Sequence, residues 1–454
     1  MSKRNFTLLI IILILGTVGF FVFLYSRGET PRGEGGEGTN FIARFNPFSN
    51  KKPAPEDTGP TEDTSSPIED PEEKMLEVEL KKVSSMEIAG FGVFTKERLK
   101  EMNPSPALPL SGEEENPAPP AKGGSGSLKP TPPPTEFATA VRYVARATGN
   151  IYQTFADKII ERKFSGTLIP KVYEAHFGNH GGSVVMRYLK GDEKTIETFF
   201  SVLPKEYLGG DATENNEIKG SFLPNNIKDI SLSSDTSKIF YLFESESNLG
   251  ESIIGTTLSL LDNKKVQIFD SPFTEWLSSW PNNKIITLST KPSANTPGYM
   301  YSIDGVGKNL TKILGDINGL TTLTSPDGKL VLYSDNNLTS YIYHTDTKSS
   351  DLLGIKTLPE KCVWGGGSDI FYCAVPKLIG ASQYPDTWYQ GEESFSDQIW
   401  KIDVETGNAT MIEDPIMALG GEDVDGIKLA LDEGESYLFF VNKKDSFLWE
   451  LKLK

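Results

Sequence analysis

Hydrophobic and polar residues alternate along most of the chain after about residue 75, in short runs that end in turn-forming sequences. An alternation with a period of two predicts β-strands that bury one face. The clearest unit is residues 322–333, where a strand end runs into the turn Ser325-Pro326-Asp327-Gly328 and an alternating strand follows. Related units recur at residues 230–241, 277–288, 362–372 and 429–440. The chain therefore repeats one sheet-forming pattern.

The spacing of this pattern indicates how the sheets are arranged. Units roughly 40–60 residues apart leave room for about four strands each, which is typical of the blades of a β-propeller. The last blade supplies only three strands of its own, and an open edge would leave backbone groups unpaired. We therefore expect residues 76–83 to close the ring as its fourth strand. The count is then seven blades, with six as the alternative if residues 88–168 do not form a full sheet.

Two repeats carry a family resemblance. The turn Ser325-Pro-Asp-Gly-Lys329 and the hairpin Ile399-Trp-Lys-Ile-Asp-Val-Glu-Thr-Gly407 resemble the repeats of TolB-type propellers and of the wider beta-transducin-like group. The resemblance extends over about residues 76–454 and implies an all-β propeller. It implies no activity, because propellers host many functions. The globular N-terminal domain that accompanies TolB has no counterpart here.

Near its start, the chain is continuously apolar and lacks the alternating pattern. Residues 6–25 form an apolar run of about 20 residues, enough to cross a bilayer as a helix. Lys3 and Arg4 precede it, and Tyr25 lies where an interfacial aromatic residue belongs. No Ala-x-Ala-like cleavage site follows, so we favour a permanent anchor over a cleaved signal peptide. We expect residues 1–5 in the cytoplasm, the lipid bilayer as a partner, and the propeller outside the membrane.

Two further segments are too rich in Pro, Gly, Ser and acidic residues to bury a core. Residues 26–74 are predicted to be a disordered linker, and residues 103–135 a disordered insertion within the propeller, which as a whole spans residues 75–454. The linker is interrupted by the apolar side chains of Phe41, Ile42, Phe45 and Phe48. These four residues form a short docking motif or rest against the membrane interface, and the alternatives are a chance cluster or weak packing on the propeller.

The charge, the Cys and His content and the absence of certain motifs argue against several classes of function. The formal net charge of −17 argues against a nucleic-acid partner, which would need clustered Lys and Arg. Two cysteines and three scattered histidines cannot build a Cys/His metal site, so we expect no metal and no cofactor. The acidic turn at residues 422–426 suggests calcium only superficially, because the remaining ligands of a calcium loop are missing. No Gly-x-Ser-x-Gly elbow or phosphate-binding loop occurs, and on this ground we expect no catalysis.

Cys362 and Cys373 flank the turn at residues 365–368, on what should be neighbouring antiparallel strands. Their separation permits a disulfide, which an extracytoplasmic location would favour. The alternative is a pair of buried thiols.

Three loops between the second and third strands of their blades are unusually long, at residues 244–255, 291–298 and 376–396. Loops that enlarge one face of a rigid scaffold often carry function. The longest holds aromatic and acidic residues typical of contact sites and carbohydrate platforms, namely Tyr384, Asp386, Trp388, Tyr389, Glu392 and Glu393. The alternative is that Trp388 and Tyr389 pack the loop onto its own blade.

Together these features predict a membrane-anchored, extracytoplasmic propeller that acts as a non-catalytic protein-interaction scaffold at the cell envelope. The alternative is a carbohydrate-binding or glycan-processing envelope protein.

Overall fold

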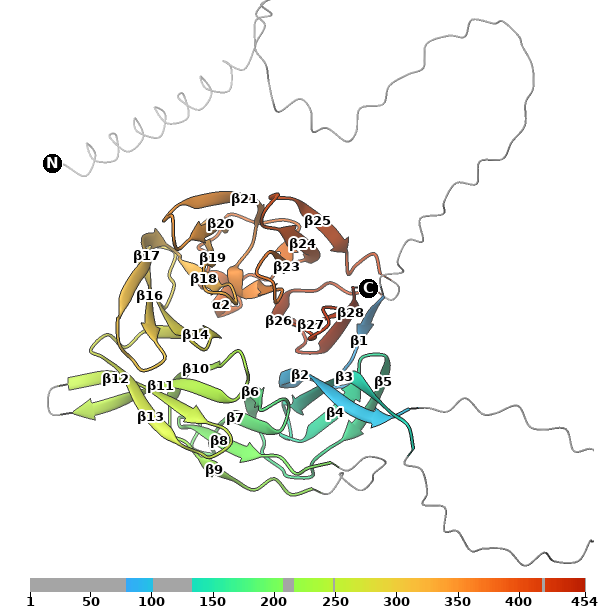
Figure 1. Cartoon of the computed structure of the whole chain (residues 1–454). Coiled ribbons are helices and arrows are strands. Elements are labelled where there is room, and N and C mark those ends of the chain that lie inside the picture. The colour runs from blue at the N-terminus through green and yellow to red at the C-terminus, as the bar shows by residue number, and fades with distance from the viewer. Residues whose placement is uncertain (1–78, 101–132, 207–215, 248–249, 419–420, 454) are drawn as a thin grey trace, which may run out of the picture. The chain divides into compact units, whose positions relative to one another are not determined.

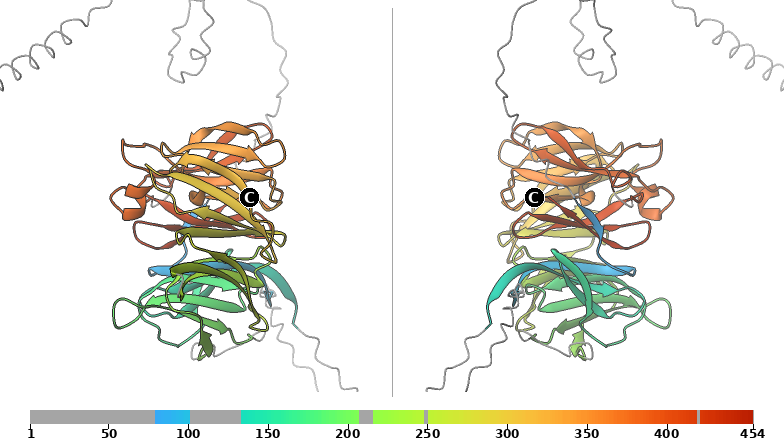
Figure 2. Two further views of the ribbon diagram at one scale, coloured as in Figure 1. Left: turned by 90° about the vertical axis from the view of Figure 1, so that its left-hand side faces the viewer. Right: turned by 90° about the vertical axis from the view of Figure 1, so that its right-hand side faces the viewer.

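The computed structural model describes residues 79–100, 133–206, 216–247, 250–418 and 421–453. These residues form seven four-stranded antiparallel sheets, arranged around an axis as the blades of a propeller (Figure 1). Viewed from the side, the ring of sheets is a thick disc (Figure 2). The expectation of an all-β propeller with seven blades is confirmed, and the alternative of six is excluded.

Each blade is an up-and-down meander whose innermost strand comes first, apart from the last blade. The first three blades consist of β2 (Ile88–Leu99), β3 (Thr135–Ala145), β4 (Ile151–Phe155) and β5 (Lys158–Lys163); β6 (Val172–Gly178), β7 (Ser183–Leu189), β8 (Ile196–Val202) and β9 (Gly220–Phe222); and β10 (Ile227–Leu232), β11 (Lys238–Ser247), β12 (Gly250–Ser259) and β13 (Lys265–Ser271).

The fourth to sixth blades follow the same order. They consist of β14 (Trp276–Asn282), β15 (Ile285–Thr290), β16 (Pro297–Asp304) and β17 (Thr311–Asn318); β18 (Thr321–Thr324), β19 (Leu330–Ser334), β20 (Thr339–His344) and β21 (Ser350–Lys356); and β22 (Cys362–Trp364), β23 (Ile370–Pro376), β24 (Asp397–Asp403) and β25 (Ala409–Glu413). A 3-10 turn, η2 (Pro359–Lys361), precedes β22, and a short helix, α2 (Asp386–Gln390), lies between β23 and β24.

The seventh blade closes the ring with strands from both ends of the domain. It contains β26 (Gly426–Leu431), β27 (Tyr437–Asn442), β28 (Leu448–Lys452) and β1 (Leu80–Lys82). β1 runs antiparallel to β28, with Leu80 opposite Leu451 and Lys82 opposite Trp449. The early strand therefore covers an edge that β28 would otherwise expose.

The repeated turn has a defined hydrogen-bond pattern. In blade five, Ser325 Oγ donates to Asp327 Oδ1 at 2.7 Å and accepts from the Leu330 amide at 3.0 Å, while Gly328 takes a φ of +78°. In blade three, Ser233 and Asp235 form the same pair at 2.7 Å, and Thr236 takes the left-handed position with a φ of +55°. The side-chain bonds thus fix the turn even where glycine is absent.

The core lies between neighbouring blades, where the sheets pack face to face. Near the axis this packing leaves little room: a Cβ added to Gly90 of β2 would stand 2.0 Å from the carbonyl oxygen of Ala175 in β6. The small residues of β2 therefore allow two inner strands to approach closely.

One predicted loop is wrong. Residues 244–255 do not form a long loop, because β11 and β12 continue to pair up to Ser247 opposite Gly250. The polar residues of this segment still extend a hairpin by backbone pairing, which an interpretation based on hydrophobic alternation misses.

Most of the predictions for the N-terminal part of the chain concern residues that the structure does not describe. No helix within the described residues is long and apolar enough to span a membrane. The apolar run at residues 6–25, the linker at 26–74 with Phe41, Ile42, Phe45 and Phe48, and most of the insertion at 103–135 lie outside the described residues.

Candidate functional site

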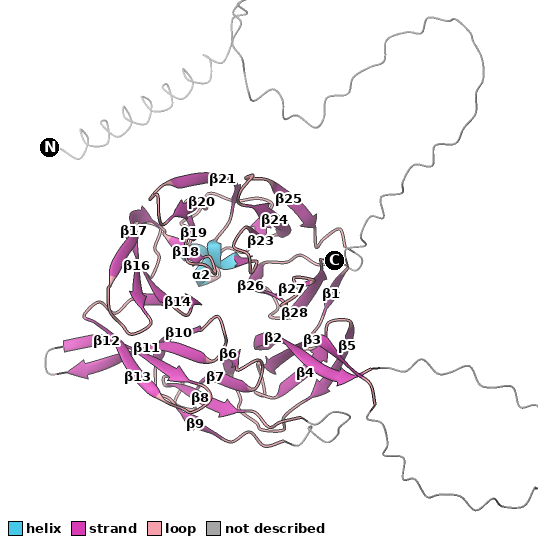
Figure 3. Cartoon of the chain, in the orientation of Figure 1, coloured by secondary structure: helices cyan, strands magenta, loops and turns pink. Residues whose placement is uncertain are grey.

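The loop between β23 and β24 carries the helix α2 over one end of the propeller axis (Figure 3). The connections between blades and the loops between second and third strands emerge on this same face, because turns alternate between the two ends of a meander. The face therefore combines α2 with η2 of the same blade and with the loop between β15 and β16.

Trp388 anchors this loop. It is 3% exposed and belongs to a small apolar cluster with Leu338, Leu358, Tyr384 and Phe395. Tyr384 and Trp388 were predicted as partner-binding residues, and the structure buries both rings in the loop's own core. Packing of the loop onto its blade was the alternative for Trp388 and Tyr389, and of these two Trp388 is buried while Tyr389 is 40% exposed.

Beneath the cluster lies a buried ion-pair network. Lys361 Nζ is 2.7 Å from Asp397 Oδ2 and also contacts Asp425 Oδ1, and all three side chains are inaccessible to solvent. Trp388 Nε1 donates to Asp425 Oδ2 at 2.9 Å, so the loop of blade six is bound to the start of blade seven. Burial and the neighbouring Asp425 raise the pKa of Asp397 to about 6, although Lys361 opposes the shift.

Asp425 responds differently within the same network. Burial alone would raise its pKa, but Lys361, the Phe395 amide and the Trp388 indole outweigh burial and hold the pKa of this carboxyl below its ordinary value. Charge-assisted bonds to a carboxylate favour its ionised form. The network therefore keeps an ionised carboxylate directly under α2.

Glu360 and Tyr389 form a second pair, next to the first in sequence, and each side chain is partly exposed to solvent and partly packed against the protein. The Tyr389 hydroxyl donates to Glu360 Oε1, joining α2 to η2. The protein around Glu360 raises the pKa of its carboxyl to about 7, against the opposing effects of the Tyr389 hydrogen bond and of Lys361 and Lys443. Burial, together with the adjacent Glu360, raises the pKa of Tyr389 well above its ordinary value. Tyr389 therefore stays protonated, while Glu360 can exist in either form near neutral pH.

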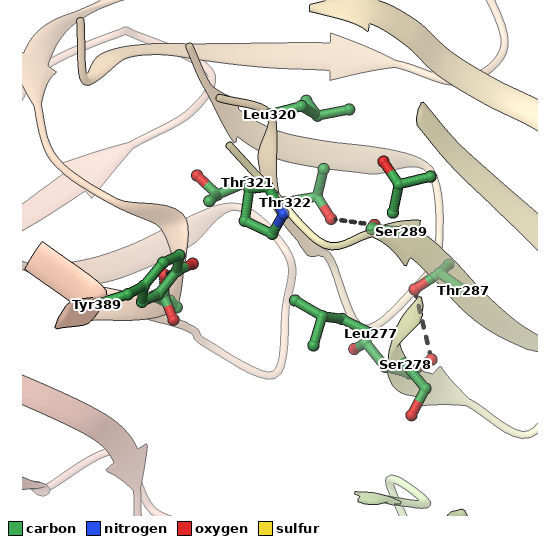
Figure 4. A pocket seen from close by; sticks show the side chains of 12 residues that line it. Leu277, Ser278, Thr287, Ser289, Leu320, Thr321, Thr322 and Tyr389 are labelled. Atoms are coloured by element: carbon green, nitrogen blue, oxygen red, sulfur yellow. Dashed lines mark hydrogen bonds between the residues drawn. The ribbon is translucent and has the colours of Figure 1, made fainter. Parts of the chain in front are cut away.

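A cavity of about 80 Å³ opens beside this pair. Its walls come from β14, β15 and β18, with Tyr389 facing them from the far side (Figure 4). The wall is lined by hydroxyls, those of Ser278, Ser279, Thr287, Ser289, Thr290, Thr321 and Thr322. Ser289 and Thr322 share a hydrogen bond of 2.9 Å across the boundary between blades four and five. Such a wall offers many donors and acceptors to a hydroxylated ligand.

A wider hollow of about 520 Å³ adjoins the cavity and shares Tyr389 and Pro292 with it. Two aromatic rings on it are exposed, Phe273 at 45% and Tyr389 at 40%. Its polar lining includes Glu275, Lys291, Asp386 and Gln390. This volume lies in the range of ordinary ligand sites, and the mixture of aromatic faces with a few polar groups is typical of them.

Some of the predicted contact residues line the two hollows and others do not. Tyr389 and Asp386 line the wide hollow, and Asp386 Oδ2 also accepts from Ser293 Oγ at 3.1 Å and from the Ala294 amide at 2.8 Å. Glu392 is exposed and Glu393 is half-buried beyond the end of α2, and neither lines the two hollows. Cys362 lies directly opposite Cys373 in the β22–β23 pair, and the two are joined in a disulfide.

Sequence reasoning missed Glu360, Lys361 and Asp397, and assigned Asp425 only to an acidic turn. No linear motif marks these residues, because they come from η2, β24 and the segment before β26 and meet only in the folded ring. Within the described parts of the chain, no group of three or more His, Cys, Asp or Glu side chains is placed to hold a metal ion.

Comparisons with known proteins were made for the chain and its fold. No family model matches the sequence, and no curated protein matches it. Similar solved structures include an oligogalacturonate lyase in complex with manganese, at 10% identity over 69% of this chain and 85% of that chain, with a TM-score of 0.48. They also include an oligogalacturonate lyase from Vibrio parahaemolyticus, at 10% identity over 70% and 86% of the two chains, with a TM-score of 0.43. A chain of a mitotic checkpoint complex matches at 11% identity over 70% and 84%, with a TM-score of 0.43.

Two predictions are withdrawn, namely the non-catalytic protein-interaction scaffold and the exclusion of catalysis. Two of the three similar structures are named as lyases, with TM-scores below 0.5. The exclusion relied on missing linear motifs, yet a propeller assembles its site from residues on several blades and needs no such motif. At this level of identity the likeness shows the fold alone, so the chemistry of this chain has to be inferred from its own residues.

Proposed function

We propose that this protein binds a carbohydrate at the face that carries α2, and acts on it by proton transfer. The observation that carries the proposal is the Glu360–Tyr389 pair at the mouth of a cavity walled by hydroxyls. The exposed rings of Tyr389 and Phe273 offer apolar faces to a sugar ring, and the hydroxyl wall offers hydrogen bonds.

Glu360 supplies the chemistry in this proposal. A carboxyl with a pKa of about 7 can donate a proton at neutral pH to the oxygen that links two sugars. The bond from that oxygen to the anomeric carbon then breaks, water adds to the carbon, and the proton that the water loses restores the carboxyl. The Tyr389 hydroxyl stays protonated and orients the carboxyl by donating a hydrogen bond to Oε1. Raised carboxyl pKa values of this kind are the usual sign of the proton donor in glycoside cleavage.

The cellular setting is part of the proposal. We infer from residues 6–25 that the protein is anchored in a membrane as a single-pass protein with its N-terminus in the cytoplasm, and that its ligand is an envelope glycan. We also infer a relation to TolB-type propellers, which the Ser325–Asp327 turn supports.

The test is direct. The purified full-length protein is incubated with neutral, amino-sugar and uronic-acid oligosaccharides, and the products are sized by mass spectrometry. We expect one class to be shortened by the wild type and left intact by Glu360→Gln. Glu405→Gln serves as the matched control, because Glu405 is exposed in the turn between β24 and β25, at the opposite end of the strands. No shortened product from any class would reject the catalytic part of the proposal.

A further inference from the structure

The two hollows carry an unbalanced set of charges. Among the described residues that line them, the acidic groups are Glu275, Glu360 and Asp386, and the basic group is Lys291. Lys291 Nζ lies 3.3 Å from Glu275 Oε2, so its charge is already offset by one of those carboxylates. Asp386 contributes a full negative charge, and Glu360 adds another whenever it is ionised.

Two further cations that lie close to Trp388 of α2 are engaged by other groups. Lys361 is fully buried between Asp397 and Asp425. Lys443 donates to the Trp388 carbonyl oxygen and lies 4.0 Å from the centre of the Trp388 ring. Neither side chain lines the cavity or the wider hollow.

A further carboxyl, that of Asp229, lies just behind the wall, and burial raises its pKa above the ordinary value. Asp229 Oδ2 accepts from the Ser278 hydroxyl at 2.6 Å and from the Ser278 amide at 2.7 Å, and Ser278 lines the cavity. The exposed Glu392 follows α2 within three residues.

We propose that the carbohydrate bound here carries protonated amines, as an oligomer of glucosamine does, and that the site discriminates against polyanionic glycans. This inference rests on the carbohydrate function proposed above. An ammonium group in the wide hollow would lie near Glu275 and Asp386, where opposite charges attract it and carboxylates accept its hydrogen bonds. A sugar carboxylate would have to be desolvated beside the same groups with no unpaired cation to receive it.

The experiment compares three hexamers by calorimetric titration of the full-length protein at slightly acidic pH. Glucosamine and N-acetylglucosamine hexamers differ only in the acetyl groups that remove the charge, and a galacturonic acid hexamer carries the opposite charge. We expect the glucosamine hexamer to bind about tenfold tighter than its acetylated form in low salt, and the galacturonic acid hexamer to bind most weakly. The advantage should shrink at about 1 M salt, where the Debye length falls to about 3 Å.

Two variants test the origin of the preference. Glu275→Gln frees the charge of Lys291 and should reduce the preference for the amine about tenfold, whereas Lys291→Gln should increase it. Glu405→Gln should leave all three affinities unchanged. Equal or tighter binding of the galacturonic acid hexamer by the wild type would overturn the charge preference while leaving carbohydrate binding intact. If none of the hexamers binds, the proposed carbohydrate function fails together with this inference.

Discussion

The indole nitrogen of Trp388 lies 2.9 Å from Oδ2 of Asp425, so a loop of the sixth blade is held by a buried carboxylate at the start of the seventh. Phe395 adds a backbone amide to the same oxygen at 3.1 Å. The loop is thus fixed at a point next to Tyr389, and the position of the Tyr389 ring depends on a buried carboxylate that lines neither hollow.

Replacement of Trp388 should therefore cost stability. We expect Trp388→Ala to lower the free energy of unfolding by about 3–5 kcal/mol, because it removes a large buried ring. Tyr389→Ala should cost about 1.5 kcal/mol or less, since its ring is 40% exposed and it loses mainly one hydrogen bond. The midpoints of urea unfolding measure both. Equal shifts for the two variants would contradict the division between an anchoring Trp388 and an accessible Tyr389.

Lys361 should be more sensitive than any exposed lysine. Lys361→Met leaves Asp397 and Asp425 buried without their counter-charge, and breaking a buried pair in this way costs about 3–5 kcal/mol. Lys348→Met, in the exposed turn between β20 and β21, should change stability by about 0.5 kcal/mol or less. Thermal unfolding of the two variants beside the wild type provides the comparison, and an unchanged midpoint for Lys361→Met would argue against the network.

Glu360 predicts a specific dependence of stability on pH. Its pKa rises from the ordinary value of 4.5 to about 7 on folding, so the folded state holds the proton more tightly. The contribution of this group to stability is fully present below pH 4.5 and is lost as the pH rises through about 7. Glu360→Gln cannot ionise and should escape this loss.

We therefore expect the wild type to lose stability between pH 4.5 and pH 7 while Glu360→Gln does not. The melting temperature of the variant minus that of the wild type should increase over this range and stay constant above it. Melting curves across this range measure it. Because all other titrating groups are common to both proteins, parallel curves would mean that the carboxyl does not titrate with a raised pKa.

The disulfide between Cys362 and Cys373 closes a short loop across the β22–β23 hairpin. The double variant Cys362→Ala/Cys373→Ala should lose about 3 kcal/mol at most, the entropy that a loop of this length removes from the unfolded chain. Chemical unfolding with and without a reductant measures the effect. If the reductant destabilises the wild type and the double variant equally, the disulfide contributes nothing.

The sequence predicted the ring well because its evidence is local and repeated. Alternation, turn residues and regular spacing recur in several blades, and the three strands of the last sheet left one place that only the early strand could fill. The Ser325–Asp327 turn depends on neighbours in sequence, so its form could be inferred without a structure.

The site could not be predicted in the same way. Glu360 and Tyr389 lie on opposite sides of β22 and β23 in sequence and meet only because the loop between β23 and β24 folds back over η2. The aromatic residues of that loop directed attention to this face, but the sequence could not tell which ring is exposed. The raised pKa of Glu360 comes from surroundings supplied by several blades, which leave no motif.

The most direct test of the account asks whether the exposed ring of Tyr389 holds a sugar. Calorimetric titrations with a glucosamine hexamer compare the wild type, Tyr389→Ala and Phe137→Ala, the last being a control aromatic residue that is 74% exposed on β3 of the first blade. We predict binding by the wild type and by Phe137→Ala with equal affinity, and a loss of about tenfold or more for Tyr389→Ala, equivalent to about 1.4 kcal/mol. Equal affinities for all three proteins would contradict the placement of the carbohydrate at this face.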